Sequence, residues 1–389
     1  MELIQQSKYI CMYDLGIKNH YGRFWNHMHR VIVGSMGSNK PRSGTYTTPW
    51  NNELDPTMAL PVLRHIPDTL SDIADQRAIE LATIAQQQNK KIYIMWSGGI
   101  DSTFVLVSFL KNLSVADHAM LAVVLTKESI DEAPVFYKDH IENKLEVIRY
   151  HSFVVDNYFL KSQGIVLSGD PADAIFGPSS GMYTHMMHDR GHLRSFRDHT
   201  KIIGNSIDQL RQESIRRYNL TGFGQWYAHK VTKNLLEVNP PEVETIADWW
   251  WWHYINLKWE SSMVRPIIRR KISKYNEPLE QQQISNFNRD TFFNTEKFQM
   301  WSFTNLKTLI GNDVATHKAA PKQYIYEFDK NEDYYKNKKK IESVPASDNY
   351  ESSLTHRPIL WDKNWVGYYG DRSRDVLVAC TEHLYRYKG

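Results

Sequence analysis

Apolar residues recur every three or four positions between Pro67 and Gln88, which is the spacing of one face of a helix. The pattern predicts a helix with apolar positions at Leu70, Ile73, Ile79, Leu81 and Ile84. A continuous apolar run within Lys91–Trp96 follows directly and indicates a buried strand. The first regular elements are therefore a helix and the strand that it leads into.

The alternation of helix and strand continues beyond this run. Apolar stretches predict, in chain order, a helix over 102–113, a strand over 120–125, a helix over 133–145, and strands over 145–150 and 164–167. Strands that alternate with helices are typical of a parallel sheet, because a crossover helix returns the chain to the same end of the sheet. We therefore predict an α/β fold with a doubly wound parallel sheet.

The pattern weakens on both sides of this alternating region. Residues 1–65 mix aromatic residues with Gly, Asn and Pro, which predicts a small N-terminal extension of short strands and loops. Strand signals fade beyond about residue 190, which predicts a largely helical C-terminal half. The expected organisation is an extension at 1–65, an α/β core at 66–190, a helical region at 191–330 and a C-terminal tail region at 331–389.

Composition narrows the class of protein. The chain has 389 residues, of which 41% are hydrophobic, and this is enough for buried cores. It has no apolar run of about 18 residues, and its N-terminus lacks the residue order of a secretory signal. Only Cys11 and Cys380 are present, too few for a disulfide framework, and the net charge of +3 favours no nucleic-acid partner. We expect a cytoplasmic protein without a membrane partner.

The segment that follows the first predicted strand carries the candidate chemistry. It reads Ser97-Gly98-Gly99-Ile-Asp101-Ser102 and stands where the strand ends and a helix begins. Two glycines let the backbone turn tightly, and a helix N-terminus offers N–H groups and partial positive charge to a phosphate. Asp101 is suited to hold a Mg²⁺ ion that bridges phosphates, and the two serines add hydroxyls. The alternative is an ordinary turn in which Asp101 and Ser102 cap the helix.

This hexapeptide resembles the pyrophosphatase loop of the PP-loop ATP pyrophosphatases. The resemblance implies an adenine nucleotide α-hydrolase-like fold, ATP as a cofactor, and its cleavage between the α and β phosphates. It implies no kinase loop, because no lysine of a Walker motif follows Gly99.

A second motif, within Val166–Gly177, resembles the segment of asparagine synthetase written LSGEGADELFGG. By that resemblance Asp173 is the second carboxylate for Mg²⁺ and pyrophosphate beside Asp101, and Asp170 lies near the reacting centre as a base. Two carboxylates that share a metal can stabilise the charge on a departing pyrophosphate. The alternative is that Asp170 and Asp173 only shape a turn between a strand and a helix.

Two departures from the family segment bear on activity. Ala174 replaces an acidic residue, and Pro171 replaces a glycine. The sequence therefore leaves open a catalytically retired ATP-binding or assembly protein on the same scaffold.

A weaker resemblance extends into the C-terminal half. Lys318, followed four residues later by Lys322, stands where the family has a lysine and an arginine that contact the phosphates in the transition state. A cation there would stabilise charge on the α-phosphate. The alternative is two lysines on a solvated helix face. The resemblance also assigns adenine contacts to the backbone near Met95, Val124 and Gly169.

The resulting expectation is an ATP-dependent carbon–nitrogen ligase with ATP and Mg²⁺ as cofactors. It would adenylate a carboxyl or amide-like oxygen of a small-molecule or modified-nucleotide substrate. Glutamine-dependent asparagine synthetases begin with a glutaminase domain whose nucleophile is a cysteine at the mature N-terminus, where this chain has Glu2. We therefore expect the nitrogen to come from free ammonia, from an amine or from a separate ammonia donor, and an oligomer is possible.

Two other sequence features have a structural as well as a functional interpretation, and the structural one is favoured for both. The run Trp249–Trp252 is expected to pack in a core or an interface rather than to stack on a base. The basic run Lys336–Lys340 is expected to form a solvated face, with a phosphate contact as the alternative.

Overall fold

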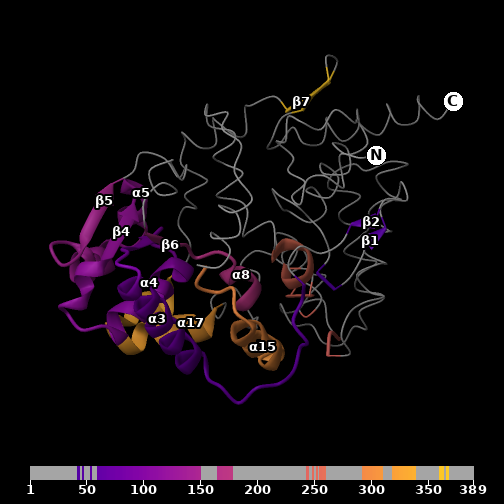
Figure 1. The fold of residues 1–389 in the computed structure, drawn as a ribbon, viewed down its shortest axis with the longest axis horizontal. Coiled ribbons are helices and arrows are strands. Elements are labelled where there is room, and N and C mark those ends of the chain that lie inside the picture. The colour runs from indigo at the N-terminus through magenta and orange to yellow at the C-terminus, as the bar shows by residue number, and fades with distance from the viewer. Residues whose placement is uncertain are drawn as a thin grey trace. The chain divides into compact units, whose positions relative to one another are not determined.

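The structure is a computed structural model that describes residues 42–43, 46–47, 53–54, 59–149, 164–177, 242–244, 248, 251–252, 254–259, 291–309, 318–338, 359–362 and 365–367. The chain divides into two compact units (Figure 1). The first unit comprises Met1–Leu60, Ser180–Ile268 and Glu351–Gly389, and the second comprises Pro61–Ser179 and Arg269–Tyr350. The candidate chemistry lies in the second unit.

The second unit contains a four-stranded parallel sheet. Its strands are β3 (Ile92–Met95), β4 (Leu121–Leu125), β5 (Glu146–Arg149) and β6 (Ile165–Leu167). They lie in the order β5-β4-β3-β6, and every neighbouring pair is parallel. All residues of β4 and β6 are buried, as expected for parallel strands that are covered on both faces. The predicted α/β class and the four predicted strands are confirmed.

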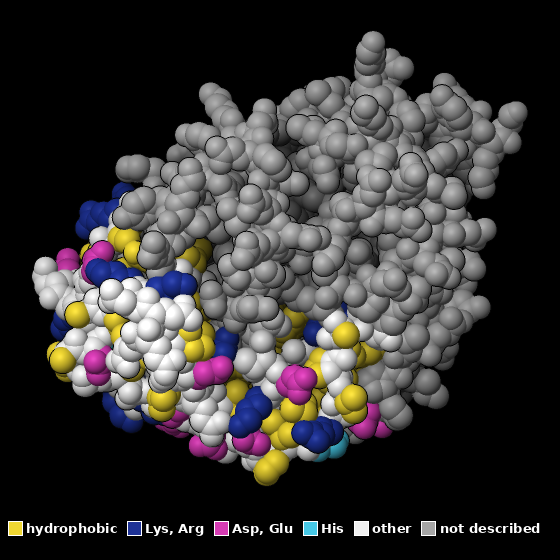
Figure 2. All heavy atoms as spheres, in the orientation of Figure 1, with side chains coloured by type: hydrophobic (Ala, Val, Ile, Leu, Met, Phe, Trp, Pro, Cys, Tyr) yellow, Lys and Arg dark blue, Asp and Glu magenta, His cyan; other side chains and the backbone are white. Residues whose placement is uncertain are grey.

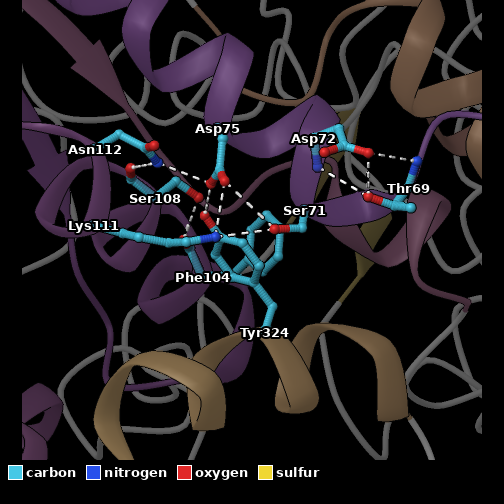
Figure 3. A network of polar contacts seen from close by, with 9 residues as sticks. All are labelled: Thr69, Ser71, Asp72, Asp75, Phe104, Ser108, Lys111, Asn112 and Tyr324. Carbon is cyan, nitrogen blue, oxygen red and sulfur yellow. Dashed lines mark hydrogen bonds and ion pairs between the residues drawn. The ribbon is translucent and has the colours of Figure 1, made fainter.

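Helix α3 (Leu70–Gln87) precedes the sheet and begins at a capping box. The Thr69 hydroxyl accepts a hydrogen bond from the Asp72 N–H at 3.1 Å, and the Asp72 carboxylate accepts one from the Thr69 N–H (Figure 3). The predicted helix is present, but the prediction of its buried apolar positions was partly wrong. Ile79 is 50% exposed, and alanines fill the buried stripe together with Leu70, Ile73 and Leu81.

Helix α4 (Ile100–Asn112) starts five residues after β3 ends and is buried continuously from Ser102 to Leu110. It contacts α3 and α17 (Ala319–Asp329), with which it is grouped in Figure 1. The Phe104 ring stands at the centre of an aromatic cluster, with its centroid 4.6 Å from that of Tyr324 and 5.1 Å from that of Phe176. This packing joins the C-terminal helix α17 to the α/β core.

The helix predicted over 133–145 is present over a shorter range, as α6 (Pro134–Phe136) continued by the π-helical turn η2 (Tyr137–Ile141). A separate helix, α5 (Lys127–Glu132), comes before it and was not predicted, and a 3₁₀ turn η1 (Asp117–Met120) precedes β4. Pro134 has no N–H to donate within a helix and disfavours helical backbone at the residue before it. Ala133 accordingly has φ −147° and ψ 67°, and a new helix begins at Pro134.

Five further short helices are described in the second unit. The first, α8 (Ala172–Ile175), follows β6, and the others are α15 (Glu296–Thr304), α16 (Leu306–Leu309), α17, and α18 (Glu332–Asn337). The Ser302 hydroxyl on α15 donates to the Ile175 carbonyl at 2.7 Å and so ties α15 to α8. Lys330, with φ +57°, turns the chain between α17 and α18.

The first unit is described only in part. The regular elements within its described residues are the antiparallel pair β1 (Tyr46–Thr47) and β2 (Glu53–Leu54), the π-helical turn η3 (Tyr254–Lys258), and the antiparallel pair β7 (Ile359–Asp362) and β8 (Trp365–Gly367). Within this unit Trp251 and Trp252 are buried, in line with the expected core role, while Trp249 and Trp250 lie outside the described residues.

The described surface carries charges of both signs. On the face shown in Figure 2, acidic and basic side chains are interspersed over the described residues, which matches the small net charge of the chain. Within the described ranges, no helix has the length and apolar character needed to cross a bilayer.

Candidate active site

The candidate site lies at the carboxyl ends of β3 and β6, which are neighbours in the sheet. The chain runs from β3 outward to β4 and β5 on one side and later adds β6 on the other side. The strand order thus changes direction at β3, and in open α/β sheets ligands bind outside the carboxyl ends of the strands at such a point. The two predicted motifs form the loops here, Trp96–Gly99 after β3 and Ser168–Pro171 after β6.

The loop after β3 is held by its own serines. The Ser97 N–H donates to the Ser102 Oγ at 3.0 Å, the two hydroxyl oxygens are 3.0 Å apart, and the Ser102 hydroxyl donates to the Gly99 carbonyl at 3.2 Å. Gly99 is the N-cap of α4, and no side chain caps the helix there. The Ser102 side chain therefore organises the turn itself, which agrees in part with the alternative of a structural turn, whereas the Asp101 carboxylate also contacts Lys318.

Gly98 is required by its surroundings and by its backbone. Its φ is +72°, and a Cβ atom on it would lie 2.4 Å from the Ser129 carbonyl oxygen and 2.7 Å from the Glu132 Cβ. No larger residue fits this position without moving α5. The turn of the loop is thus fixed against the neighbouring helix.

The loop after β6 packs directly on the start of α4. A Cβ atom on Gly169 would lie 2.9 Å from the Asp101 Cβ and 3.0 Å from the Ser102 backbone nitrogen. Glycine thus permits the close approach of two loops from adjacent strands. Because Asp101 opens α4 and Asp173 lies on α8, the approach brings two acidic residues to the same end of the sheet.

Lys318 joins these two aspartates. Its Nζ donates to the Asp101 Oδ1 at 2.5 Å, to the Asp101 Oδ2 at 2.6 Å and to the Asp173 Oδ1 at 2.8 Å. The lysine side chain is only 5% exposed, whereas the Asp101 and Asp173 side chains are 26% and 38% exposed. Three residues from three separate sequence motifs therefore meet at one point.

The backbone at Lys318 is unusual. Lys318 is the N-cap of α17 and has φ +56° and ψ 41°, the left-handed conformation that costs a non-glycine residue about 1–2 kcal/mol. Non-glycine residues in this conformation recur at functional sites, where the surroundings compensate the strain.

Lys318 is protonated at neutral pH. Burial by itself would lower the pKa of its ammonium, but the charges of Asp101 and Asp173 and the hydrogen bonds to them raise the pKa above its usual 10.5. A lysine that remains charged in a buried position can act as a fixed cation.

The other predicted residues make contacts of their own. Lys322 is buried one turn further along α17, and its N–H donates to the Lys318 carbonyl at 3.2 Å. The alternative of two solvated lysines is therefore wrong. The Asp170 N–H donates to the Ser168 Oγ at 3.2 Å within the loop after β6. Met95 and Val124, on the ends of neighbouring strands, pack together with Val166.

A second ion pair next to the loop was not predicted. The Lys338 Nζ donates to the Glu132 Oε1 at 2.8 Å, and the two side chains are 7% and 3% exposed. The solvated face expected for the basic run applies to Lys336, which is 62% exposed and pairs with Glu332. It is wrong for Lys338. No local pattern identifies this pair, because its members are 206 residues apart.

Tyr334 on α18 lies within electrostatic reach of both charge clusters. Burial raises the pKa of its hydroxyl, which is buried without a hydrogen-bond partner among the described residues, and the charges of Asp101 and Glu132 raise the pKa further. The phenol therefore stays neutral. It presents a protonated hydroxyl, rather than a further negative charge, close to the site.

The aspartate pair fits a divalent cation only in part. Among the described residues no group of three or more His, Cys, Asp or Glu side chains could hold a metal ion by itself. Asp101 and Asp173 nevertheless converge on one cation, the Lys318 ammonium. Mg²⁺ typically takes one or two carboxylates and completes its shell with substrate phosphates and water. The pair thus suits a metal ion that arrives with a nucleotide.

A scan against protein-family models and searches of curated proteins and of solved structures find no match to this chain. Function is therefore inferred from the two loops and from the lysine that joins them.

Proposed function

We propose that this chain is an ATP-dependent adenylating ligase of the asparagine synthetase-like PP-loop type. It would split ATP into AMP and pyrophosphate and activate a carboxyl or amide-like oxygen for attack by ammonia or an amine. The convergence of Asp101, Asp173 and Lys318 beyond the neighbouring strands β3 and β6 is the observation that carries the proposal. Two acids for a metal and one buried cation are the groups that this chemistry needs.

The position of the first motif supports an adenine nucleotide. The loop after β3 leads into α4, whose N-cap Gly99 has no side chain to cap the helix. A helix N-terminus without such a cap presents N–H groups and partial positive charge to phosphates. The order β5-β4-β3-β6 puts this helix at the point where nucleotides bind in open α/β sheets.

Each residue then has a defined role. Ser97, Gly98 and Gly99 shape the loop that receives the pyrophosphate portion, and Asp101 and Asp173 hold the magnesium ion that accompanies it. That ion, when bound, offsets negative charge on the leaving pyrophosphate.

Lys318 is protonated and would place its ammonium against the α-phosphate as charge grows there. Lys322, one turn away, is the candidate for a second cation. Asp170 on the neighbouring loop would accept the proton that the attacking amine loses.

A catalytically retired ATP-binding or assembly protein is the second candidate. Ala174 is 3% exposed, at the position where the asparagine synthetase segment has an acidic residue. A buried alanine on α8 supplies no carboxylate to the candidate site. A scaffold of this kind would bind ATP without cleaving it.

Pyrophosphate release separates the two candidates. The purified full chain would be incubated with MgATP and a panel of amino acids, amines and nucleotides, each with and without ammonium. Release that depends on one acceptor and is lost in Asp101→Ala supports the ligase. ATP binding without pyrophosphate release from any acceptor supports the retired protein.

A further inference from the structure

The Lys318 ammonium occupies the point where Asp101 and Asp173 converge. It contacts three of their carboxylate oxygens at distances between 2.5 and 2.8 Å. A divalent cation held by the same two residues would need the same oxygens. Two cations cannot share one position, because their charges repel and their contact distances overlap.

The two sides of this ion pair differ in exposure. Lys318 is 5% exposed, while Asp101 and Asp173 are 26% and 38% exposed. The carboxylates can therefore be reached from solvent more readily than the ammonium. A cation that arrives with a nucleotide would meet the aspartates first.

Helix α17 is anchored without Lys318. The Tyr324 hydroxyl donates to Asp75 at 2.5 Å, and the Tyr324 ring packs with its centroid 4.6 Å from that of Phe104. Both contacts lie within α17 beyond its first turn. The Lys318 side chain is a flexible four-carbon chain at the start of this helix. The ammonium can therefore leave the aspartates through rotation of a side chain while the helix stays in place.

We propose that Lys318 is an internal counter-ion of the Asp101–Asp173 pair and that it exchanges with the divalent cation when a metal–nucleotide complex binds. The proposal rests on the proposed function, since it assigns the regulation of the same site. It has two consequences. Free metal without nucleotide binds weakly, because it must displace a buried ammonium. Lys318 becomes available to the phosphates only after the metal has taken the carboxylates.

Manganese binding in the absence of nucleotide tests the exchange directly. Free Mn²⁺ would be measured by its paramagnetic resonance signal during titration of the full chain. Lys318→Met removes the charge but keeps the length of the side chain. We expect the affinity for Mn²⁺ to rise on the order of 100-fold in this variant, because a competing positive charge next to two carboxylates is removed.

Two further variants control the result. Lys111→Met removes a lysine from another ion pair, the one with Asp75 at 2.8 Å, and should leave Mn²⁺ binding as weak as in wild type. Adding Asp101→Asn to Lys318→Met should abolish the gain in affinity. Equal Mn²⁺ affinity of the wild type and Lys318→Met would overturn the proposal.

The wild type offers a second measurement if Lys318→Met does not fold. In protein labelled with ¹⁵N-lysine, the Nζ signal of Lys318 is assigned through its loss in Lys318→Arg. The signal should move when Mg²⁺ is added together with α,β-methylene-ATP and should stay in place with Mg²⁺ alone. No movement with the complex, or equal movement with Mg²⁺ alone, would contradict the exchange.

The same preparations distinguish this proposal from the ligase proposal. Pyrophosphate release by the wild type, together with equal Mn²⁺ affinities of wild type and Lys318→Met, would overturn only the exchange. A gain of Mn²⁺ affinity in Lys318→Met, together with no pyrophosphate release from any acceptor, would overturn only the ligase.

Discussion

Two lysine–aspartate clusters meet α17, and they are built in opposite ways. Around Asp75, several donors converge on one acid: Lys111 Nζ at 2.8 Å, Asn112 Nδ2 at 2.8 Å and the Tyr324 hydroxyl at 2.5 Å (Figure 3). At the candidate site, one ammonium serves two acids, Asp101 and Asp173. Many donors on one carboxylate fasten helices together, whereas one cation between two carboxylates can be exchanged for another.

The pKa shifts in the two clusters reflect the same difference. Burial raises the pKa of Asp75, but hydrogen bonds from Lys111, Tyr324 and Asn112 outweigh it and leave the pKa below its usual 3.8. The network around Asp75 is therefore stable as an ionised unit. At the site it is the lysine whose pKa is shifted, upward, by two negative charges. The Asp75 network serves stability, and we assign the aspartate pair to chemistry.

Asparagine substitutions of Asp101 and Asp75 should affect different properties, activity for Asp101 and stability for Asp75. This is the largest expected difference. Asp101→Asn should lower pyrophosphate release on the order of 1,000-fold, because it weakens the metal site and the charge stabilisation of the leaving group. Asp75→Asn should keep the rate per folded molecule within about threefold and lower the unfolding free energy by about 1–3 kcal/mol. Initial rates and urea unfolding of both variants measure the two effects.

The assignment of Asp75 to stability and Asp101 to chemistry would break if Asp75→Asn lost activity as strongly as Asp101→Asn while remaining folded. Circular dichroism of both variants checks the fold before the rates are compared.

Two glycine substitutions test whether the loop after β3 is held in one conformation. Gly98→Ala should cost about 2–3 kcal/mol of stability, because it forces a left-handed backbone on alanine and drives a Cβ atom to within 2.4 Å of the Ser129 carbonyl oxygen. Gly99→Ala is the matched control. Its φ is −77°, the nearest neighbour of an added Cβ atom is the Ser97 Oγ at 3.3 Å, and a loss of about 1 kcal/mol or less is expected. Equal losses in urea unfolding would show that the loop is not fixed at Gly98.

Tyr324→Phe tests how α17 is anchored. The change removes the hydroxyl that donates to Asp75 but keeps the ring against Phe104. We expect a loss of about 1 kcal/mol in thermal or urea unfolding, with turnover unchanged. Tyr326→Phe on the same helix is the control and should change stability less. A loss of Mn²⁺ or nucleotide binding in Tyr324→Phe would show that the two clusters are not independent.

Acid unfolding gives the smallest expected effect. The pKa of Asp75 is lowered in the folded state. Its carboxylate therefore contributes stability that is present above pH 3.8, the usual pKa of the group, and is lost as the pH falls through the folded pKa. The side chain is 25% exposed, so the contribution is modest. The difference in melting temperature between the wild type and Asp75→Asn should shrink below pH 3.8. A constant difference down to the acid transition would contradict the assignment.

Local patterns predicted the sheet well because parallel strands are buried on both faces. The runs over 120–125 and 164–167 coincide with β4 and β6, in which every residue is buried. The helix over 67–88 was also predicted, but Ile79 faces solvent and alanines fill the buried face, since close packing of α3 on α4 requires small residues. The helix predicted over 133–145 spans only residues 134–141, and Pro134 separates it from α5.

Prediction of the candidate site needed more than local patterns. The loops around Asp101 and Asp173 were predicted because each is a short motif at the end of a strand. Lys318 was predicted only through family resemblance, since its contact with Asp101 spans 217 positions of the chain. The Lys338–Glu132 pair has no motif, so it became visible only when the fold brought α5 and the end of α18 together.

Phosphorus-31 NMR of the products of ATP tests the central claim most directly, because it shows which phosphate bond is broken. The full chain would be incubated with MgATP and the acceptor that supports turnover, with Asp101→Asn measured in parallel. Cleavage between the α and β phosphates predicts AMP and pyrophosphate in equal amounts from the wild type and neither from Asp101→Asn. Formation of ADP and inorganic phosphate by the wild type, with the same dependence on Asp101, would contradict the adenylating ligase.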